Sequence, residues 1–142
     1  MNDKTLFFQE QLLKWYHHHG RHDLPWQHQS PYHVWLSEIM LQQTQVSTVI
    51  PYYQRFIEAF PRIEALAEAN VFELWAGLGY YSRAKHLHQT AKIIAKEYHG
   101  MFPHSPEALQ KLPGIGPSTC AAILSQAFDL PFAICDGNVK RV

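Results

Sequence analysis

The sequence has few of the residues that build disulfide frameworks or metal clusters. Its 142 residues include only two cysteines, Cys120 and Cys135. Two are too few for a disulfide scaffold or a cysteine-based metal site, so we predict no metal site in this chain. We expect both to be small buried side chains in a reducing compartment.

The sequence also lacks long apolar runs and an excess of charge. No run approaches the roughly 18 apolar residues that span a membrane, and the N-terminal residues do not resemble a secretory signal. Lys plus Arg and Asp plus Glu each number 12, which gives a formal net charge of zero. This balance is weak evidence against nucleic-acid binding, although backbone amides bind phosphate without net charge. We expect an intracellular, cytoplasmic protein without membrane contact.

What the sequence does contain is apolar residues at helical spacing throughout, with clear helix boundaries. It is 46% hydrophobic, and no alternating run indicates a sheet. Thr5, Ser30-Pro31 and Ser105-Pro106 are predicted helix starts, and Gly20 and Gly100 are predicted helix ends. We predict one all-α domain over residues 1–142, with helices at 5–19, 31–43, 46–60, 63–68, 71–76, 80–99, 106–111 and 117–128, and another after Asp136.

A glycine-rich turn, residues 112–116 (Leu-Pro-Gly-Ile-Gly), joins two of these helices. Gly114 and Gly116 both permit positive φ, and neither has a side chain that would keep a phosphate away. The next helix begins at Pro117, so its unpaired N–H groups face the same point and favour an anion there. Carbonyls on the other side of the turn could hold a sodium or potassium ion. The plainer interpretation is an ordinary turn between helices.

Two carboxylates occupy unusual settings. Glu38 lies within an apolar segment, so burial should raise its pKa and suit it to act as a general acid. Asp136 precedes an expected helix, whose N-terminus favours the ionised form. Glycosidic bond cleavage uses two carboxyl groups with different roles, one that stays protonated and one that stays charged. The plainer interpretations are a solvent-facing glutamate and an ordinary N-cap aspartate.

Several segments resemble the adenine DNA glycosylases, helix–hairpin–helix enzymes that act on adenine opposite 8-oxoguanine or guanine. The resemblance is carried by Leu24-Pro25-Trp26, by residues 31–46 with their Met-Leu-Gln-Gln-Thr sequence, by Gly-Leu-Gly-Tyr-Tyr in 77–84, by the hairpin, and by 136–142. It implies a six-helix-barrel glycosylase domain. Two differences stand out: the loop 27–30 is one residue short, and Gln27 replaces an arginine of some relatives.

The resemblance also implies roles for individual residues. Glu38 would protonate the adenine, and Asp136 would stabilise the oxocarbenium-like sugar after the base is flipped out. Leu41, Gln42 and Gln43 would probe the opposite strand, and Asn138 would line the base pocket. Tyr80 would act as an aromatic wedge beside the oxidised guanine, with core packing as the alternative. The phosphate-binding residues would be Leu112, Gly114, Ile115, Gly116, Ser118 and Lys140.

Ser118 distinguishes between the chemistries of this superfamily. Relatives such as endonuclease III carry a lysine there, whose amine forms a Schiff base with the sugar and nicks the strand. A serine cannot form that imine, so the sequence predicts hydrolysis alone.

The resemblance further implies segments that we expect to lie beyond this chain. These are helices that pack on the helix at 5–19 and four cysteines for a [4Fe–4S] cluster, which Cys120 and Cys135 cannot supply. We therefore expect a monomeric catalytic portion that ends before the iron–sulfur region and binds double-stranded DNA. The alternatives are a non-catalytic DNA-binding fragment and an endonuclease III-like pyrimidine glycosylase/lyase.

Overall fold

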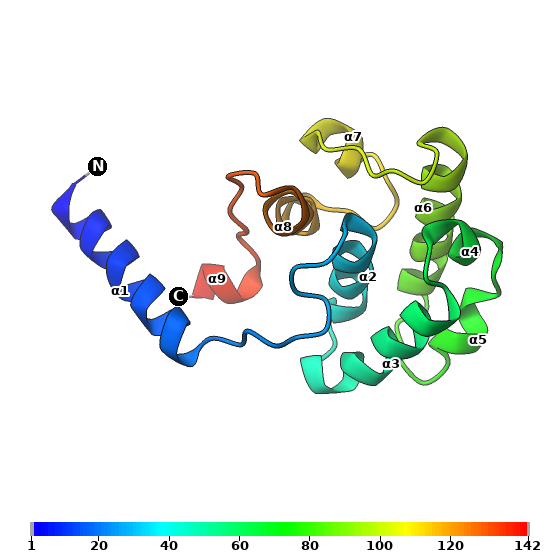
Figure 1. Ribbon diagram of the computed structural model, residues 1–142, viewed down its shortest axis with the longest axis horizontal. Coiled ribbons are helices and arrows are strands. Elements are labelled where there is room, and N and C mark those ends of the chain that lie inside the picture. The colour runs from blue at the N-terminus through cyan, green and yellow to red at the C-terminus, as the bar shows by residue number, and fades with distance from the viewer. Residues whose placement is uncertain (1, 142) are drawn as a thin grey trace.

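The computed structural model describes residues 2–141 and confirms the all-α prediction, since those residues form helices and contain no strand. The helices follow one another in the order drawn in Figure 1. Their bounds are α1 Asp3–His19, α2 Pro31–Leu41, α3 Val46–Ala59, α4 Ile63–Glu68, α5 Val71–Trp75, α6 Ser82–Glu97, α7 Pro106–Gln110, α8 Pro117–Phe128 and α9 Gly137–Arg141.

Proline and glycine set several of these boundaries, as predicted. Pro31, Pro106 and Pro117 each open a helix, and Ser105 accepts a hydrogen bond from the amide of Ala108. The first predicted cap was wrong, because Asn2 caps α1 by accepting from the Thr5 amide at 2.8 Å. α2 and α6 end two residues earlier than predicted.

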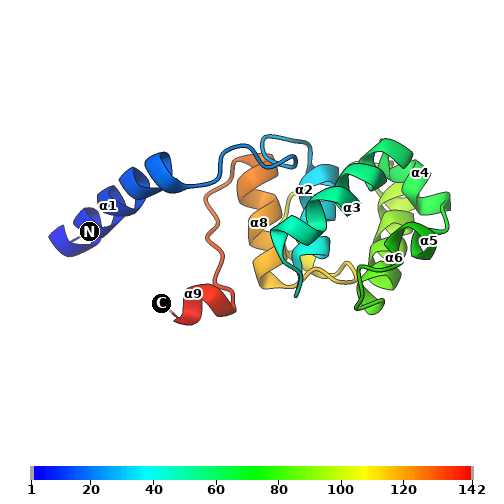
Figure 2. The ribbon, with the colours of Figure 1, turned by 90° about the horizontal axis from the view of Figure 1, so that it is seen from below.

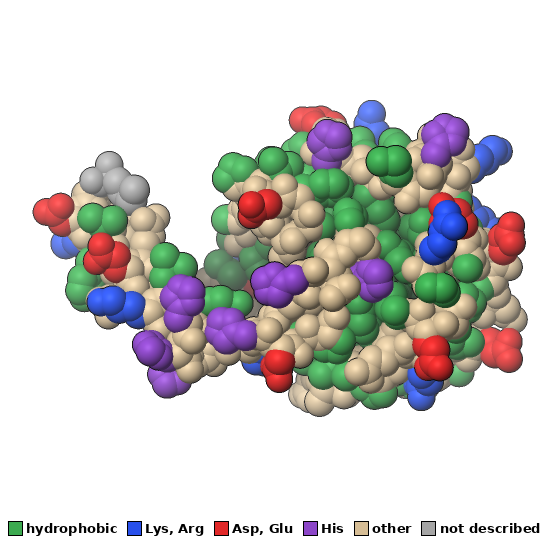
Figure 3. Space-filling model, in the orientation of Figure 1, with side chains coloured by type: hydrophobic (Ala, Val, Ile, Leu, Met, Phe, Trp, Pro, Cys, Tyr) green, Lys and Arg blue, Asp and Glu red, His purple; other side chains and the backbone are tan. Residues whose placement is uncertain are grey.

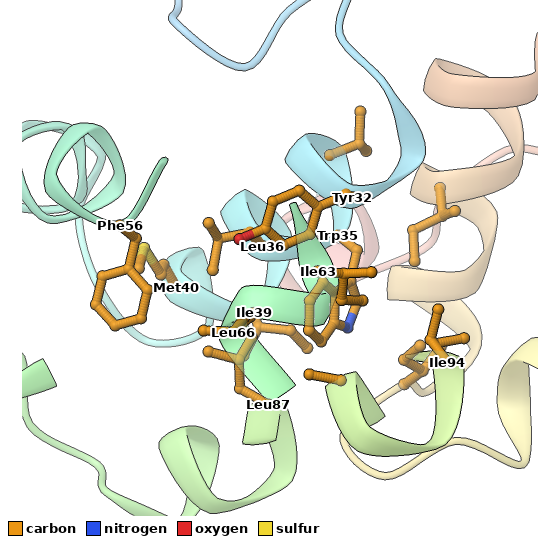
Figure 4. Close-up of a cluster of buried hydrophobic side chains, with 14 of the residues drawn as sticks. Tyr32, Trp35, Leu36, Ile39, Met40, Phe56, Ile63, Leu66, Leu87 and Ile94 are labelled. Atoms are coloured by element: carbon orange, nitrogen blue, oxygen red, sulfur yellow. The ribbon is translucent and has the colours of Figure 1, made fainter. Parts of the chain in front are cut away.

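α2 is the central helix of the core. Seven of its eleven residues are buried, and it packs against α3, α6 and α8. Figure 4 shows its side chains among residues from α3, α4 and α6. Trp35, Leu36 and Met40 are fully enclosed, and burial of such side chains supplies the main driving force for folding. A helix that is apolar on nearly all sides holds its few polar groups in fixed positions.

α1 lies outside this core. No residue of α1 is buried, and Figures 1 and 2 show it projecting from the other helices. In the space-filling view its surface carries hydrophobic side chains and several histidines (Figure 3). Leu12 and Trp15 are 50% and 57% exposed, as expected for an apolar face without a packing partner. That α1 packs on helices beyond this chain stays a prediction.

The last turn of α1 holds His17, His18 and His19, all exposed as expected for a solvated helix end. No helix among residues 2–141 is long and apolar enough to cross a membrane.

Candidate active site

Glu38 projects from the third turn of α2 into a partly enclosed position. Burial raises the pKa of its carboxyl, a hydrogen bond from Gln126 lowers it and the negative charge of Asp136 raises it, so that the pKa is about 7. The Gln126 amide donates to Glu38 Oε1 at 3.5 Å. A substantial fraction of Glu38 is therefore protonated at neutral pH, as the sequence predicted.

Asp136 lies immediately before α9 and caps it. Its Oδ1 accepts a hydrogen bond from the Val139 amide at 2.9 Å, and its carbonyl accepts from the Lys140 amide at 3.0 Å. The N-cap interpretation is thus correct, and it is compatible with the catalytic one. The charge of Asp136 acts on Glu38, so the fold brings together two acids that are far apart in the sequence.

A cavity of about 500 Å³ opens beside Glu38. Its walls come from α1, from the segment 24–28 and from the end of α8, and they comprise Tyr16, Leu24, Trp26, Gln27, His28, Glu38, Ser125, Gln126 and Asp129. Cavities of this size accept small organic groups such as a nucleobase. The predicted pocket residue Asn138 instead bonds Arg141 within α9 and is exposed.

The hairpin at residues 112–116 turns on a single left-handed glycine. Gly114 has φ +80, whereas Gly116 is extended at φ −90 and ψ −174, so only one of the two glycines that permit positive φ adopts it. The helix that follows needs only an extended N-cap residue, which Gly116 supplies. A Cβ on Gly116 would have no atom within 4 Å, so the backbone here is open to a phosphate.

The predicted phosphate contacts divide into two groups. The side chains of Leu112 and Ile115 are buried and their amides already donate within the turn, so these residues anchor the hairpin in the core. The amides of Gly114, Gly116 and Ser118 have no acceptor among residues 2–141. Together with the N-terminus of α8 they form a concentrated set of donors for an anion.

The predicted opposite-strand segment lies directly beside the hairpin. The Gln42 side chain donates to Gly114 O at 3.2 Å and to Thr119 Oγ1 at 3.5 Å. Gln43, the next residue, is exposed and has φ +58. Leu41 is half-buried at the end of α2, one turn beyond Glu38.

Tyr80 is 60% exposed and has φ +48. This exposure excludes the core-packing interpretation of its side chain. The apolar residue that is buried in the segment before Tyr80 is Leu78, which is 6% exposed. Tyr80 is therefore available on the surface, as a wedge residue must be.

Two residues of the site were not singled out from the sequence. Gln126 is polar in a helix where a polar residue indicates only a solvated face, so no sequence signal identified it. Arg83 lies within the segment 77–84 quoted above and contacts carbonyls on two loops, one preceding Gln43 and the other preceding Tyr80. A charged residue in the first turn of a helix usually indicates a surface position, but Arg83 is only 5% exposed.

The remaining predicted residues lie at the edges of the site. Ser118 is half-buried in the first turn of α8 and Lys140 is exposed on α9. Cys120 is buried, but Cys135 is exposed, which corrects the expectation for that residue. The segment 131–135 that contains Cys135 is exposed throughout.

Comparisons with known proteins agree with this geometry. Residues 36–142 match the family described as HhH-GPD superfamily base excision DNA repair protein. The adenine DNA glycosylase of Buchnera aphidicola subsp. Baizongia pistaciae is 54% identical over 97% of this chain and 40% of its own length. The human adenine DNA glycosylase is 45% identical over 95% of this chain and 27% of its own length. The chain thus spans less than half the length of these relatives.

Solved structures show the same fold. A thermostable thymine-DNA glycosylase superimposes with a TM-score of 0.90 at 29% identity, over 96% of this chain and 65% of that one. A non-covalent endonuclease III–DNA complex superimposes with a TM-score of 0.83 at 20% identity, over 99% and 67%. With a matching family that covers most of the chain, and with relatives of this identity, the protein belongs to the HhH-GPD superfamily of base excision DNA repair proteins.

Proposed function

We propose that this chain is the catalytic portion of a DNA glycosylase that removes adenine mispaired with 8-oxoguanine or guanine. The observation that carries the proposal is Glu38, whose pKa is raised to about 7 in reach of the charge of Asp136. A protonated and an ionised carboxyl in one site are the pair that N-glycosidic bond hydrolysis requires.

In this proposal the target adenine leaves the duplex and enters the cavity beside Glu38. Glu38 donates its proton to the adenine ring, which makes the base a better leaving group. The Asp136 carboxylate stabilises the positive charge that develops on the sugar as the bond breaks. Glu38, now ionised, can accept a proton from the water that attacks the sugar.

In the same proposal, the hairpin and the end of α2 contact the duplex. The donors at Gly116 and Ser118 would hold a phosphate without reading sequence, with Lys140 as a further contact. Leu41, Gln42 and Gln43 would enter the gap left by the flipped base, and Tyr80 would lie beside the opposite base.

Strand cleavage is not part of this proposal. The lyase reaction of the superfamily uses a lysine amine that attacks the sugar, and Ser118 occupies that position. The enzyme would hydrolyse the base and leave an abasic site, and it would act as a monomer.

The resemblance implies an iron–sulfur cluster, and the hairpin suggests a bound alkali-metal ion. A [4Fe–4S] cluster takes four cysteine thiolates, and the chain has only Cys120 and Cys135, so its residues cannot hold one. A sodium or potassium ion at the hairpin would be held by backbone carbonyls. Those of Pro113 and Gly114 accept hydrogen bonds from Thr90 at 2.8 Å and Gln42 at 3.2 Å, and each keeps a second lone pair.

A second candidate function is DNA binding without catalysis. It is favoured by α1, whose apolar side chains are exposed although Tyr16 at its end lines the cavity. Because α1 forms one wall of the cavity, a lack of packing on α1 would leave the site incompletely ordered.

One experiment separates the two. The 142-residue chain is incubated with duplex DNA that carries adenine opposite 8-oxoguanine, and abasic sites are assayed. The proposed enzyme is supported if the wild type releases adenine and Glu38→Gln does not, while both bind DNA equally well. Binding without release supports the second candidate, and release by Glu38→Gln would contradict the assignment of the acid.

A further inference from the structure

The Arg83 side chain is a buried cation without an anionic partner. It is 5% exposed, and no carboxylate among residues 2–141 lies within ion-pair distance of it. Burial lowers the pKa of its guanidinium, which reflects the cost of moving the charge out of water. A position that is costly to occupy with a cation must obtain its stabilisation from neighbouring dipoles.

Those dipoles are backbone carbonyls from two separate segments. Nη1 donates to Met40 O and Gln42 O, each at 2.6 Å, and lies 3.3 Å from Ile39 O. Nη2 donates to Gly79 O at 3.1 Å and lies 3.4 Å from Leu78 O. The first set is the C-terminal end of α2, where unpaired carbonyls and the helix dipole favour a positive charge. The second set follows α5.

Arginine is suited to this arrangement because its planar guanidinium presents several donors in fixed directions. Lysine would offer one ammonium, which cannot reach both segments with the same geometry. The guanidinium carbon also lies 5.1 Å from the Trp75 ring centroid and 5.5 Å from that of Tyr80, within the range of cation–π attraction. One guanidinium therefore contacts carbonyls of both segments and two aromatic rings.

Two of the carbonyls that accept from Arg83, one in each segment, directly precede a residue in the left-handed region. Gln42 O belongs to the peptide that leads into Gln43 at φ +58, and Gly79 O to the peptide that leads into Tyr80 at φ +48. Non-glycine residues adopt this conformation at a cost and persist in it when the surroundings fix them. The guanidinium helps to fix the peptide plane that precedes each strained residue. Trp75 Nε1 also donates to Gly79 O at 2.9 Å, and Thr44 Oγ1 to Gln42 O at 3.4 Å, but only Arg83 contacts both planes.

We propose that Arg83 is a positioning residue that locks the Gln42–Gln43 segment and the Gly79–Tyr80 segment into one rigid unit facing the DNA. The proposal rests on the proposed function, in which these two segments contact the opposite strand. Because one group holds both, neither segment can reorient alone, and the probe and the wedge engage the strand together. Selection of the lesion then depends on a residue that itself touches no DNA.

The test compares Arg83→Lys with Ile94→Val, a control that removes one buried methyl group from the same helix and contacts neither segment. For each folded variant, fluorescence anisotropy gives the Kd for two duplexes. One carries an uncleavable abasic analogue opposite 8-oxoguanine and the other is fully paired. We expect Arg83→Lys to lower the preference for the lesion duplex by about tenfold, the effect of losing one charge-assisted hydrogen bond. The control should keep the preference. An unchanged preference in Arg83→Lys overturns the proposal.

A measurement on the unmodified chain tests the clamp without any variant. Amide hydrogen exchange reports local opening, and we expect the hydrogen-bonded amides of the two segments, those of Gln42, Thr44 and Leu78, to show one common protection factor. Two distinct protection factors overturn the clamp, whether or not Arg83→Lys folds. A wild-type chain that binds both duplexes equally contradicts the proposed function, and hydrogen exchange then still decides whether the clamp exists.

Discussion

Replacing Glu38 with glutamine should stabilise the folded protein while it removes the proposed acid. Glutamine has nearly the same shape as glutamate and can still accept the hydrogen bond from Gln126. It carries no charge at any pH, so it avoids the cost of holding a carboxylate beside Asp136 in a partly buried site.

The size of this effect follows from the pKa of Glu38. Burial raises that pKa from 4.5 to about 7, which corresponds to a preference for the protonated form of about 3 kcal/mol. Below pH 4.5 the carboxyl is protonated in both the folded and the unfolded chain, so it adds no pH dependence there. Between 4.5 and about 7 the unfolded chain ionises first, so folding stability falls as the pH rises. Above about 7 the whole penalty is present.

Urea denaturation of the wild type and Glu38→Gln at pH 5, 6, 7 and 8 measures this difference, and other titrating groups cancel when the two are subtracted. The difference should grow by about 3 kcal/mol from pH 4.5 to above pH 7 and then stay constant. Glu97→Gln, at the exposed end of α6, serves as the control and should show no such growth. A difference that does not change with pH would refute the argument that burial sets the state of Glu38.

The other predictions concern the same site. If protonated Glu38 is the acid, single-turnover release of adenine should fall about tenfold for each pH unit above about 7; a flat profile to pH 9 would exclude that role. Ser118→Lys should gain strand nicking and be trapped on DNA by borohydride, and absence of a trapped product would mean that the position does not face the sugar. Gly116→Ala should weaken DNA binding in anisotropy assays with an unchanged melting temperature, since its Cβ would enter open space. By contrast, Gly114→Ala should lose about 1 to 2 kcal/mol of stability in denaturation, because its φ is +80 and its Cβ would lie 3.1 Å from His86; equal stability of the two variants would contradict this account of the hairpin.

Much of the fold can be predicted from the sequence because proline and glycine act locally. Ser30-Pro31, Ser105-Pro106 and Pro117 open helices where predicted, since a proline at the first helical position needs no partner elsewhere in the fold. The setting of Glu38 could also be predicted, because its apolar neighbours are consecutive in the chain.

The features that escaped prediction depend on contacts distant in the sequence. The acceptors of Arg83 on the α2 side lie 41 to 44 positions away, and nothing local to the arginine indicates that it is buried. Gln42 likewise meets Gly114 at a separation of 72 positions. The extended backbone of Gly116 could not be predicted, because a glycine permits many conformations and only the start of α8 selects one of them.

The helix α2 has a consequence for how variants of this protein are interpreted. The same eleven residues that form the centre of the core also carry Glu38 and lead into the Gln42–Gln43 segment. A substitution at Trp35 or Met40 would therefore lower the amount of folded protein and displace the acid in the molecules that do fold. Variants in α2 need separate measurements of abundance and of turnover per folded molecule, because both the packing of the core and the position of the acid restrict which residues this helix tolerates.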